Sequence, residues 1–400
     1  MRALRGLVPV LMLVIAFVIA APARAADPFC TAGYGGRPAR PGPRLRFGID
    51  PGVAGSAGGV QLASTPDDLA RDEAAVQALR PRGRLLVVRL NRLFWSDGEA
   101  GISHFQSLVS RYAGAGFEVE LQVRYHPTQA ENGDIAAWAQ WVRHVVDVFG
   151  PDRRVVDMTI TNEVNLNVSP NTSDGSYKNA RNALIEGIEA AHDEALRHRF
   201  GQLRFGFTYA YRWDPQSDAA FFTYLRTAGG KAFQQALGFV GVDFYPGSFY
   251  PPTLAGTTYA GATDQALGTV RDCFLPMAGI GPGTPLWLTE TGVPTGATES
   301  PAAQSEALSQ IVRAAAAVSG TYGLTDLRWF DLRDANSTPT GSLPAASLTF
   351  ATDGLLTADY APKPAFATYR GLIAALGARA PVLRRHRVHR RARHRRRRHG

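Results

Sequence analysis

Residues 155–164 read VVDMTITNEV, and residues 286–292 read LWLTETG. Each stretch is a short apolar run that ends at a glutamate, Glu163 in the first and Glu290 in the second. Short runs of branched and aromatic residues are typical of strands that are buried on both faces, as in a parallel sheet. The sequence therefore predicts two strands with a glutamate at the carboxyl end of each.

Further runs of this kind complete a series of eight predicted strands. They lie at Leu45–Asp50, Leu85–Asn91, Glu118–Tyr125, Val155–Asn162, Arg204–Tyr211, Phe239–Phe244, Leu286–Glu290 and Asp326–Asp331. Predicted helices lie at Pro66–Leu79, Ser103–Ala115, Asp134–Phe149, Asn179–Arg199, Asp218–Ala228, Thr263–Met277, Ala302–Val318 and Ala365–Leu376. Strands that alternate with helices predict parallel pairing through right-handed crossovers. Eight such units favour a closed (β/α)8 TIM barrel, of the α/β class, in a single domain.

A doubly wound open sheet is the alternative to the barrel. It would usually carry a glycine-rich phosphate turn after its first strand, but the glycines at residues 52–59 do not match the dinucleotide fingerprint. We interpret them as a flexible loop. Thr65 is the expected N-cap of the first helix. Residues 337–359 are expected to form a long polar loop that shapes the mouth of the barrel.

The N-terminus has the pattern of a secretory signal peptide. Arg2 and Arg5 precede an apolar run at Leu7–Ala21, and residues 23–25 read ARA, a typical cleavage site. The run is short for a membrane span, so we expect cleavage after residue 25 and a secreted, extracellular protein.

The rest of the chain is expected to contain an irregular lead-in at residues 26–43, the barrel domain at residues 44–380 and a disordered tail at residues 381–400. From Arg384 to Gly400 there are ten arginines, four histidines and no acidic residue. Such a segment cannot bury apolar surface. The formal net charge of +9 depends on this tail and the N-terminal arginines, without which acidic residues outnumber basic ones.

The basic tail can bind anionic surfaces. For an exported protein we expect anionic cell-wall polymer or lipid headgroups as its partners, and no nucleic acid. A solvated tail with no specific partner is the alternative. We expect the protein to be a monomer, in the medium or associated with the cell wall.

The chain has two cysteines, Cys30 and Cys273. Outside the cell they could form a disulfide, because both are expected near the same end of the barrel. Two buried thiols are the alternative.

Two carboxylates at the catalytic face of a barrel can cleave a glycosidic bond. The reaction needs a proton donor for the leaving oxygen, and a carboxylate at the anomeric carbon or a water held by one. Glu163 and Glu290 would meet at that face, where neighbouring groups and burial can separate their pKa values. The alternatives are a structural salt bridge for Glu163 and a loop carboxylate bound to local amides for Glu290.

With Asn162-Glu163 ending the fourth strand and Glu290 ending the seventh, the chain resembles the retaining (β/α)8 glycoside hydrolases of clan A, which include cellulases, mannanases and xylosidase-like enzymes. The resemblance implies that Glu163 is the general acid/base and Glu290 the nucleophile. It implies that Asn162 binds the 2-hydroxyl of the sugar. Val164 stands where many members have proline, so the family within the clan stays open.

The resemblance also implies four further substrate-binding residues. Arg89 on the second strand would support the nucleophile, and the hydroxyl of Tyr245 would contact it. Trp329 would form the floor of the sugar subsite before the cleaved bond, and His126, a weaker match, follows the third strand. Tyr245 and Trp329 could instead be core aromatics, and His126 a structural histidine.

Other chemistries fit the sequence less well. No Gly-x-Ser-x-Gly elbow precedes a helix, no His-Glu-x-x-His run suggests a metal, and we expect no cofactor. A lyase or aldolase would need a buried lysine, but lysine is scarce. The main alternative is a non-catalytic carbohydrate-binding or cell-surface attachment protein on a barrel scaffold. The predicted substrate is an oligo- or polysaccharide.

Overall fold

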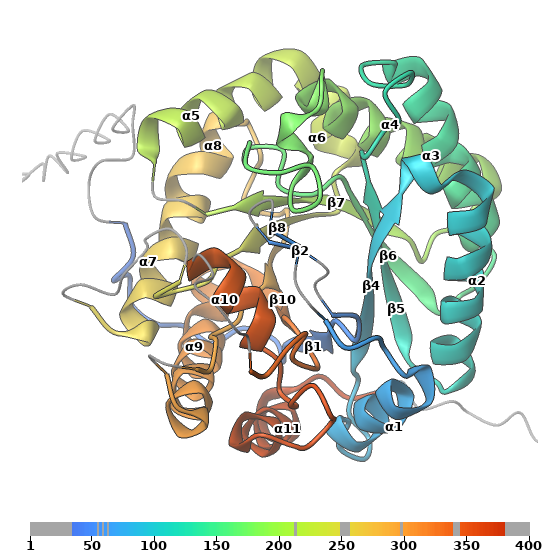
Figure 1. Cartoon of the computed structure of the whole chain (residues 1–400). Coiled ribbons are helices and arrows are strands. Elements are labelled where there is room, and N and C mark those ends of the chain that lie inside the picture. The colour runs from blue at the N-terminus through green and yellow to red at the C-terminus, as the bar shows by residue number, and fades with distance from the viewer. Residues whose placement is uncertain are drawn as a thin grey trace, which may run out of the picture.

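The described residues form a closed barrel of parallel strands with helices outside it (Figure 1). The structure, a computed structural model, describes residues 34–53, 56–57, 60–61, 64–211, 214–248, 257–296, 299–338 and 345–380. The barrel strands are β1 (Arg46–Ile49), β4 (Val87–Phe94), β5 (Glu118–Arg124), β6 (Val155–Ile160), β7 (Arg204–Ala210), β8 (Phe239–Asp243), β9 (Leu286–Glu290) and β10 (Leu324–Trp329). They confirm the predicted eight strands and the single (β/α)8 barrel.

The strands pair in the order β1-β10-β9-β8-β7-β6-β5-β4, and β1 closes the barrel by pairing with β4. Every residue of β8 and β9 is buried, as expected for strands covered on both faces. Gly48 of β1 leaves room for a large neighbour, because a Cβ there would collide with the side chain of Arg328 inside the barrel.

Helices follow the strands along the chain and, apart from α10 (Ala345–Thr352), lie outside the barrel (Figure 1). They are α1 (Leu69–Leu79), α2 (Gly98–Gly114), α3 (Ile135–Phe149), α4 (Ala180–His198), α5 (Pro215–Tyr224), α6 (Gly230–Ala236), α7 (Tyr259–Thr269), α8 (Leu275–Met277), α9 (Pro301–Tyr322), α10 (Ala345–Thr352) and α11 (Pro364–Leu376). Short 3₁₀ turns lie at Trp95–Asp97 and Asp174–Ser176, and π turns lie at Leu225–Gly229 and Val270–Phe274. The predicted helices form, although π turns follow α5 and α7. No helix in the described ranges is both long and apolar enough to span a bilayer.

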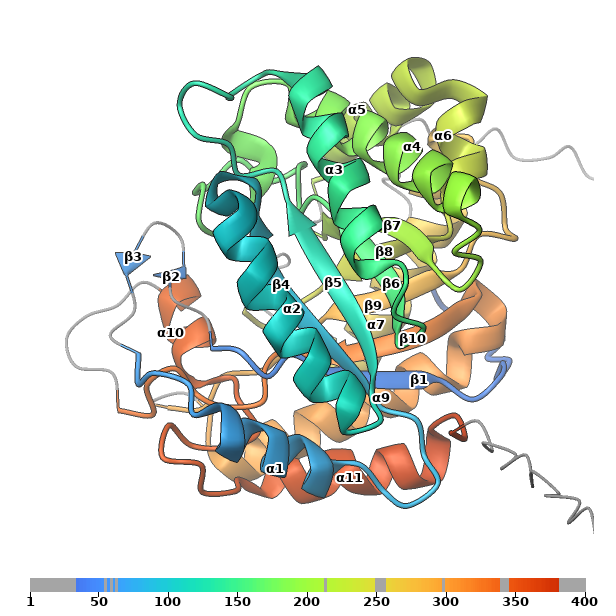
Figure 2. The same ribbon diagram turned by 90° about the vertical axis from the view of Figure 1, so that its right-hand side faces the viewer.

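Three local predictions are wrong. The N-cap of α1 is Asp68, whose carboxylate accepts hydrogen bonds from two backbone amides of the first turn, and not Thr65. The loop after β1 contains a two-stranded ladder, β2 (Ser56–Ala57) and β3 (Val60–Gln61). The predicted polar loop after β10 contains α10, which lies beside β2 at one end of the barrel (Figure 2).

Tertiary packing explains why α10 forms. Phe350 of α10 makes edge contacts with Tyr245 and Phe330, with ring centroids 5.5 and 5.6 Å apart, and Ala351 is buried in the same cluster. These partners come from other parts of the chain, so the local sequence did not reveal the helix.

The signal peptide, Cys30 and the basic tail lie outside the described residues. Cys273 is buried on the π turn after α7. The disulfide therefore stays a prediction.

Candidate active site

Three carboxylates meet at the carboxyl ends of the strands. Glu163 follows β6, Glu290 ends β9 and Asp243 ends β8, and one carboxylate oxygen of each lies within 4.8 Å of one from each of the other two. Glu163 is 8% exposed and Glu290 5% exposed. The barrel thus joins the two glutamates predicted from separate segments and adds an aspartate between them.

The backbone around Glu163 departs from extended geometry. Thr161 and Glu163 have φ angles of 67° and 46°, in the left-handed region that disfavours residues other than glycine. Such a conformation costs about 1–3 kcal/mol per residue and persists only where the surroundings impose it. The amide of Glu163 donates to Thr208 Oγ1 at 3.1 Å, and that of Asn162 to Asp174 Oδ2 at 2.8 Å. These bonds hold the turn that directs Glu163 into the barrel mouth.

Both oxygens of Glu290 accept hydrogen bonds. Arg89 Nη1 donates to Oε1 at 2.6 Å, and the hydroxyl of Tyr245 donates to Oε2 at 2.8 Å. Burial, followed by the charge of Glu290, raises the pKa of Tyr245 well above its usual value, so its hydroxyl keeps its proton and can donate. These contacts fix the orientation of the Glu290 carboxylate.

Glu163 lies in a different environment. Burial, followed by the charges of Asp243 and Glu290, raises its pKa well above the usual value for a glutamate. Asp243 itself is fully enclosed and accepts a hydrogen bond from Thr289 Oγ1 at 2.7 Å; burial and then Glu290 raise its pKa as well. Glu163 therefore holds its proton to higher pH than an exposed glutamate, as a proton donor requires.

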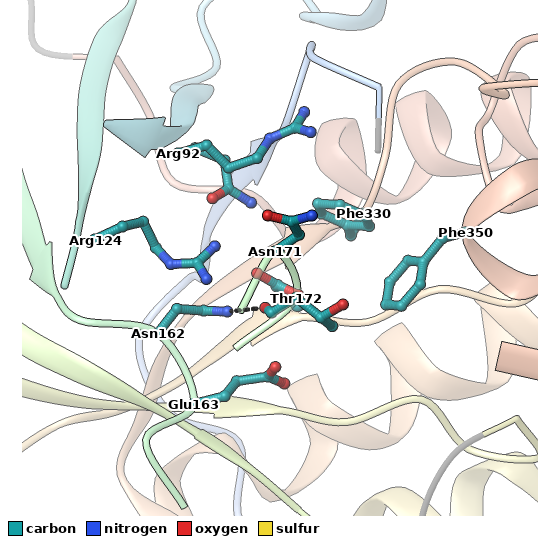
Figure 3. Close-up of a pocket in the computed structure, with 10 residues that line it drawn as sticks. Arg92, Arg124, Asn162, Glu163, Asn171, Thr172, Phe330 and Phe350 are labelled. Atoms are coloured by element: carbon teal, nitrogen blue, oxygen red, sulfur yellow. Dashed lines mark hydrogen bonds between the residues drawn. The ribbon is translucent and has the colours of Figure 1, made fainter. Parts of the chain in front are cut away.

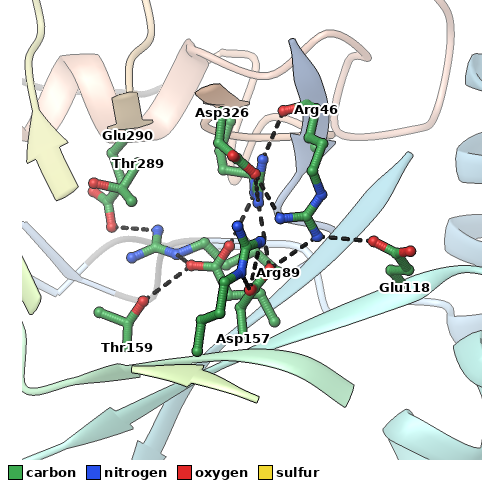
Figure 4. Close-up of polar contacts among 12 residues, drawn as sticks. Arg46, Arg89, Glu118, Asp157, Thr159, Thr289, Glu290 and Asp326 are labelled. Atoms are coloured by element: carbon green, nitrogen blue, oxygen red, sulfur yellow. Dashed lines mark hydrogen bonds and ion pairs between the residues drawn. The ribbon is translucent and has the colours of Figure 1, made fainter. Parts of the chain in front are cut away.

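Arg89 is held by a charged network that fills the barrel beneath the site (Figure 4). Arg89 is fully buried, and its Nε lies 3.3 Å from Glu120 Oε1. Glu120 also accepts from Arg328 at 2.9 Å and from Thr159 at 3.0 Å. Arg328 in turn pairs with Asp326 at 2.9 Å.

Arg46 extends the same network toward the other end of the barrel. It contacts Asp326, Asp157 and Glu118 at 2.8–3.0 Å. Acidic and basic side chains therefore alternate along this network from Glu290 to Glu118. Each charged side chain in it has a partner of opposite charge, which buried ions require.

Replacing Arg89 by methionine is expected to lower the free energy of unfolding by about 3–5 kcal/mol, because Glu120 and Glu290 lose a buried cation. Urea denaturation measures this difference. The matched control is Arg111→Met, since the Arg111–Glu73 pair is 2.9 Å long but partly exposed. The Arg111→Met change should lower the free energy of unfolding by about 0–1 kcal/mol. Equal effects of the two substitutions would contradict the role given to the buried network.

The site opens into a small cavity that is partly open to solvent. Figure 3 shows the labelled side chains around it. The lining residues are Asn91, Arg92, Arg124, Asn162, Glu163, Asn171, Thr172, Glu290, Phe330 and Phe350. Polar and charged residues therefore dominate, with two phenylalanines on one side.

Asn162 lines this cavity beside Glu163. Its Oδ1 accepts from Gln122 Nε2 at 2.6 Å and from Thr208 Oγ1 at 2.9 Å, and its Nδ2 donates to the carbonyl of Thr172 at 2.9 Å. These bonds orient the amide. Nδ2 has a second hydrogen, which none of these bonds uses.

Two residues predicted to bind substrate, Trp329 and His126, do not line the cavity. Trp329 is 0% exposed, its Nε1 donates to the carbonyl of Asp353 at 3.3 Å, and its ring faces Tyr369 of α11. This placement corrects the predicted subsite floor, because a ring buried against α11 cannot stack on a sugar. Phe330, the next residue, lines the cavity instead.

His126 is half-buried. Its Nδ1 lies 3.0 Å from Ser96 Oγ, and its ring packs against Phe94 and Tyr177. These contacts favour the structural interpretation of His126.

Sequence reasoning missed several lining residues. Arg124 ends β5 and Phe330 directly follows β10, so their positions at strand ends could have indicated them. Asn171 and Thr172 come from the loop after β6, and Phe350 from the unpredicted α10. No local pattern marks these three.

Two clusters in the described parts of the chain have the spacing of cation ligands: the three carboxylates of the site, and Asp147 with Glu194 and His198 on the surface. In the first, Arg89 and Tyr245 already engage both oxygens of Glu290. In the second, Glu194 is engaged by Arg197 at 2.7 Å and by His198.

No family model and no curated protein matches this sequence. Solved structures do match its fold. A β-glucosidase from Thermotoga maritima, in complex with a substituted glucoimidazole, aligns over 86% of this chain and 100% of its own, with 13% identity and a TM-score of 0.58.

Two further structures align similarly. GH5_18 from Streptomyces cattleya, in complex with GlcNAc, covers 85% of this chain and 82% of its own at 16% identity, with a TM-score of 0.58. A family 39 glycoside hydrolase from Bacteroides cellulosilyticus covers 84% and 64% at 12% identity, with a TM-score of 0.54. This chain therefore has the (β/α)8 barrel fold of these glycoside hydrolases.

Proposed function

We propose that this protein is an exported glycoside hydrolase that cleaves O-glycosidic bonds with retention of anomeric configuration. One observation carries the proposal: oxygens of Glu163 and Glu290 lie within 4.8 Å of each other in a buried site open to a polar cavity. Retaining enzymes hold their two carboxyl groups about 5–5.5 Å apart, whereas inverting enzymes leave about 6.5–9.5 Å for a water molecule. The short spacing favours retention.

In the first step, Glu163 gives its proton to the glycosidic oxygen as the bond from that oxygen to the anomeric carbon breaks. The Glu290 carboxylate forms a bond to the same carbon. In the second step, Glu163, now a carboxylate, takes a proton from water while the water oxygen displaces Glu290. Both side chains return to their starting states.

The neighbouring residues support these roles. Arg89 and Tyr245 hold the Glu290 carboxylate, and Tyr245 keeps its donor proton because its pKa is raised. Asn162, oriented by Gln122 and Thr208, is in place to contact a sugar hydroxyl.

The test is a panel of aryl glycosides and polysaccharides, assayed with the purified protein. We expect turnover of at least one substrate, with the first-formed product in the anomeric configuration of the substrate by NMR. Saccharide binding without turnover by the unmodified protein would favour the non-catalytic alternative. An inverted first product would refute the double displacement.

The dependence of kcat/KM on pH tests the proton donor. Activity should fall as pH rises through the raised pKa of Glu163, because the donor must be protonated. Asp243→Asn removes a carboxylate that raises this pKa, so the alkaline limb should move about one unit to lower pH. Asp193→Asn, an exposed carboxylate on α4, serves as the control and should not move the limb. An unchanged limb in Asp243→Asn would contradict the coupling.

Export and surface association belong to the proposal and rest on the sequence alone. The N-terminal pattern supports cleavage before Ala26, which N-terminal sequencing of protein recovered from the medium would test. The arginine-rich tail supports retention on anionic wall polymer or lipid headgroups. A chain truncated after residue 380 should then bind such surfaces more weakly, and equal binding would exclude the tail as the anchor.

A further inference from the structure

The cavity holds cationic groups that the cleavage mechanism does not use. Arg92 and Arg124 line it together with Asn91 and Asn171. Figure 3 shows the two guanidinium groups beside the cavity, with Arg92 across it from Glu163. The chemistry at the two glutamates needs neither arginine, so their presence calls for another explanation.

Arg124 is only partly satisfied by the protein. It is 1% exposed, and its Nε donates to Asp174 Oδ1 at 2.8 Å. Its Nη2 is buried and finds no hydrogen-bond partner among the described residues. An unsatisfied buried donor is costly, more so when it is charged. A ligand that accepts hydrogen bonds on this edge of the guanidinium would remove the cost.

Arg92 is directed to the cavity by an irregularity in β4. The pairing of β4 with β5 shifts register between Leu90 and Leu93, and Arg92 has a φ of 69°. Such bulges occur beside active sites, where they redirect side chains. Arg92 Nη2 donates to the carbonyl of Val53. No described carboxylate forms a direct ion pair with Arg92, but the buried Asp50 is close enough for the two charges to interact. Asn91, in the same bulge, leaves its Oδ1 buried without a partner in the described chain.

The two other arginines at the site, Arg89 and Arg124, form ion pairs with carboxylates. Arg89 pairs with Glu290 and Glu120, and Arg124 pairs with Asp174 through one edge only. Arg92 interacts with the charge of Asp50 but donates only one of the hydrogen bonds described here, to Val53, so its other donors are available on the side of the cavity away from Glu163. A neutral sugar would offer these donors only hydroxyl oxygens, whereas a carboxylate or sulfate group would accept from them in stronger, charge-assisted hydrogen bonds.

We propose that the cavity recognises a sugar unit with an anionic group, a uronic acid carboxylate or a sulfate ester, through Arg92 and the free edge of Arg124. The proposal rests on the proposed function for the identity of the ligand as a glycan. Guanidinium groups suit such ligands, because their fork of donors matches the paired oxygens of the anion. Discrimination against neutral sugars follows, because their hydroxyl oxygens accept more weakly from a guanidinium than a charged oxygen does.

Binding to the full chain carrying Glu290→Gln tests the proposal without requiring turnover. Calorimetry would use oligogalacturonate and oligoglucuronate, each beside its carboxyl-reduced neutral form, and a sulfated, uronate-free carrageenan oligosaccharide. We expect at least one anionic oligosaccharide to bind about tenfold more tightly than its neutral counterpart, or than desulfated carrageenan, as for a hydrogen bond to a charged group. The uronate and carrageenan arms distinguish carboxylate from sulfate.

Arg92→Gln, added to Glu290→Gln, should remove most of this preference, because it lowers the affinity for the anionic form more than the affinity for the neutral form. Arg313→Gln, which removes an exposed arginine on the outer helix α9, should keep the preference. Arg124→Lys keeps the positive charge but loses the paired donors of the guanidinium, so a folded Arg124→Lys variant should show a weaker preference for the anionic form. The result with Arg92→Gln tests the proposal whether or not the Arg124 variant folds.

Equal affinity for anionic and neutral forms, a preference that survives Arg92→Gln, or no binding of any anionic glycan would overturn the proposal. Turnover of aryl glycosides by the unmodified protein is scored separately. Turnover without an anionic preference would leave the hydrolase proposal standing and remove only this one. An anionic preference without turnover would leave this proposal standing and remove the hydrolase proposal.

Discussion

Replacing Glu290 by glutamine is expected to reduce kcat/KM by at least about 10⁴-fold on every substrate that the protein cleaves, because the amide cannot form the glycosyl-enzyme bond. Glutamine has nearly the same shape and keeps an oxygen that can accept from Arg89 Nη1, which donates to Glu290 at 2.6 Å. The loss should therefore appear in catalysis more than in folding. Steady-state kinetics with an activated aryl glycoside measures it, with urea denaturation of the same variant as the check on stability.

The matched control is Glu306→Gln, an exposed glutamate on α9. It should leave kcat/KM unchanged. Glu290→Ala provides a second readout, since azide can enter the space of the missing carboxylate and attack the anomeric carbon directly. The resulting glycosyl azide should have the configuration opposite to that of the substrate. Activity of Glu290→Gln close to that of the unmodified protein would remove Glu290 as the nucleophile.

Replacing Glu163 by alanine is expected to affect substrates according to their leaving group. For a natural glycan, whose leaving oxygen needs a proton, kcat/KM should fall by about 10²–10⁴-fold. For an aryl glycoside with a strongly acidic phenol, formation of the glycosyl-enzyme needs little protonation and should change little. Breakdown of that intermediate also uses Glu163, so kcat should fall and a burst of phenol should precede a slow steady state.

Azide distinguishes this variant from the one at Glu290. In Glu163→Ala, azide can replace water in the second step, so the glycosyl azide should retain the configuration of the substrate. Glu306→Ala, a change at an exposed position of α9, is the control and should show no leaving-group dependence. An equal loss on good and poor leaving groups would argue that Glu163 is not the proton donor.

The barrel could be predicted because its signal is local. Each strand is a contiguous apolar run, and the helices between them have their own caps and breaks, such as Asp134 before α3 and Gly150 at its end. The elements that the sequence did not reveal are small. The β2–β3 ladder has two residues in each strand, and α10 depends on contacts with Tyr245 and Phe330. Packing between distant segments, and not propensity, stabilises these elements.

The site was predictable where a residue's position on a strand determines its direction. Arg89 lies in β4, and alternation along the strand predicts that it points into the barrel, where it contacts Glu290. The same alternation places Arg328 inside and Trp329 outside, against α11. The resemblance favoured Trp329 for its chemistry, but the direction of its side chain is opposite to the one that role requires.

The amino-acid sequence by itself determined the barrel, its order of strands and the two glutamates at the ends of β6 and β9, because these follow from short-range patterns and from the parallel topology that they impose. Only the tertiary structure decided which side chains share the cavity. A bulge directs Arg92 inward, a left-handed turn orients Glu163, and α10 brings Phe350 to the mouth. Each of these depends on contacts between residues far apart in the chain, and no local pattern encodes such contacts.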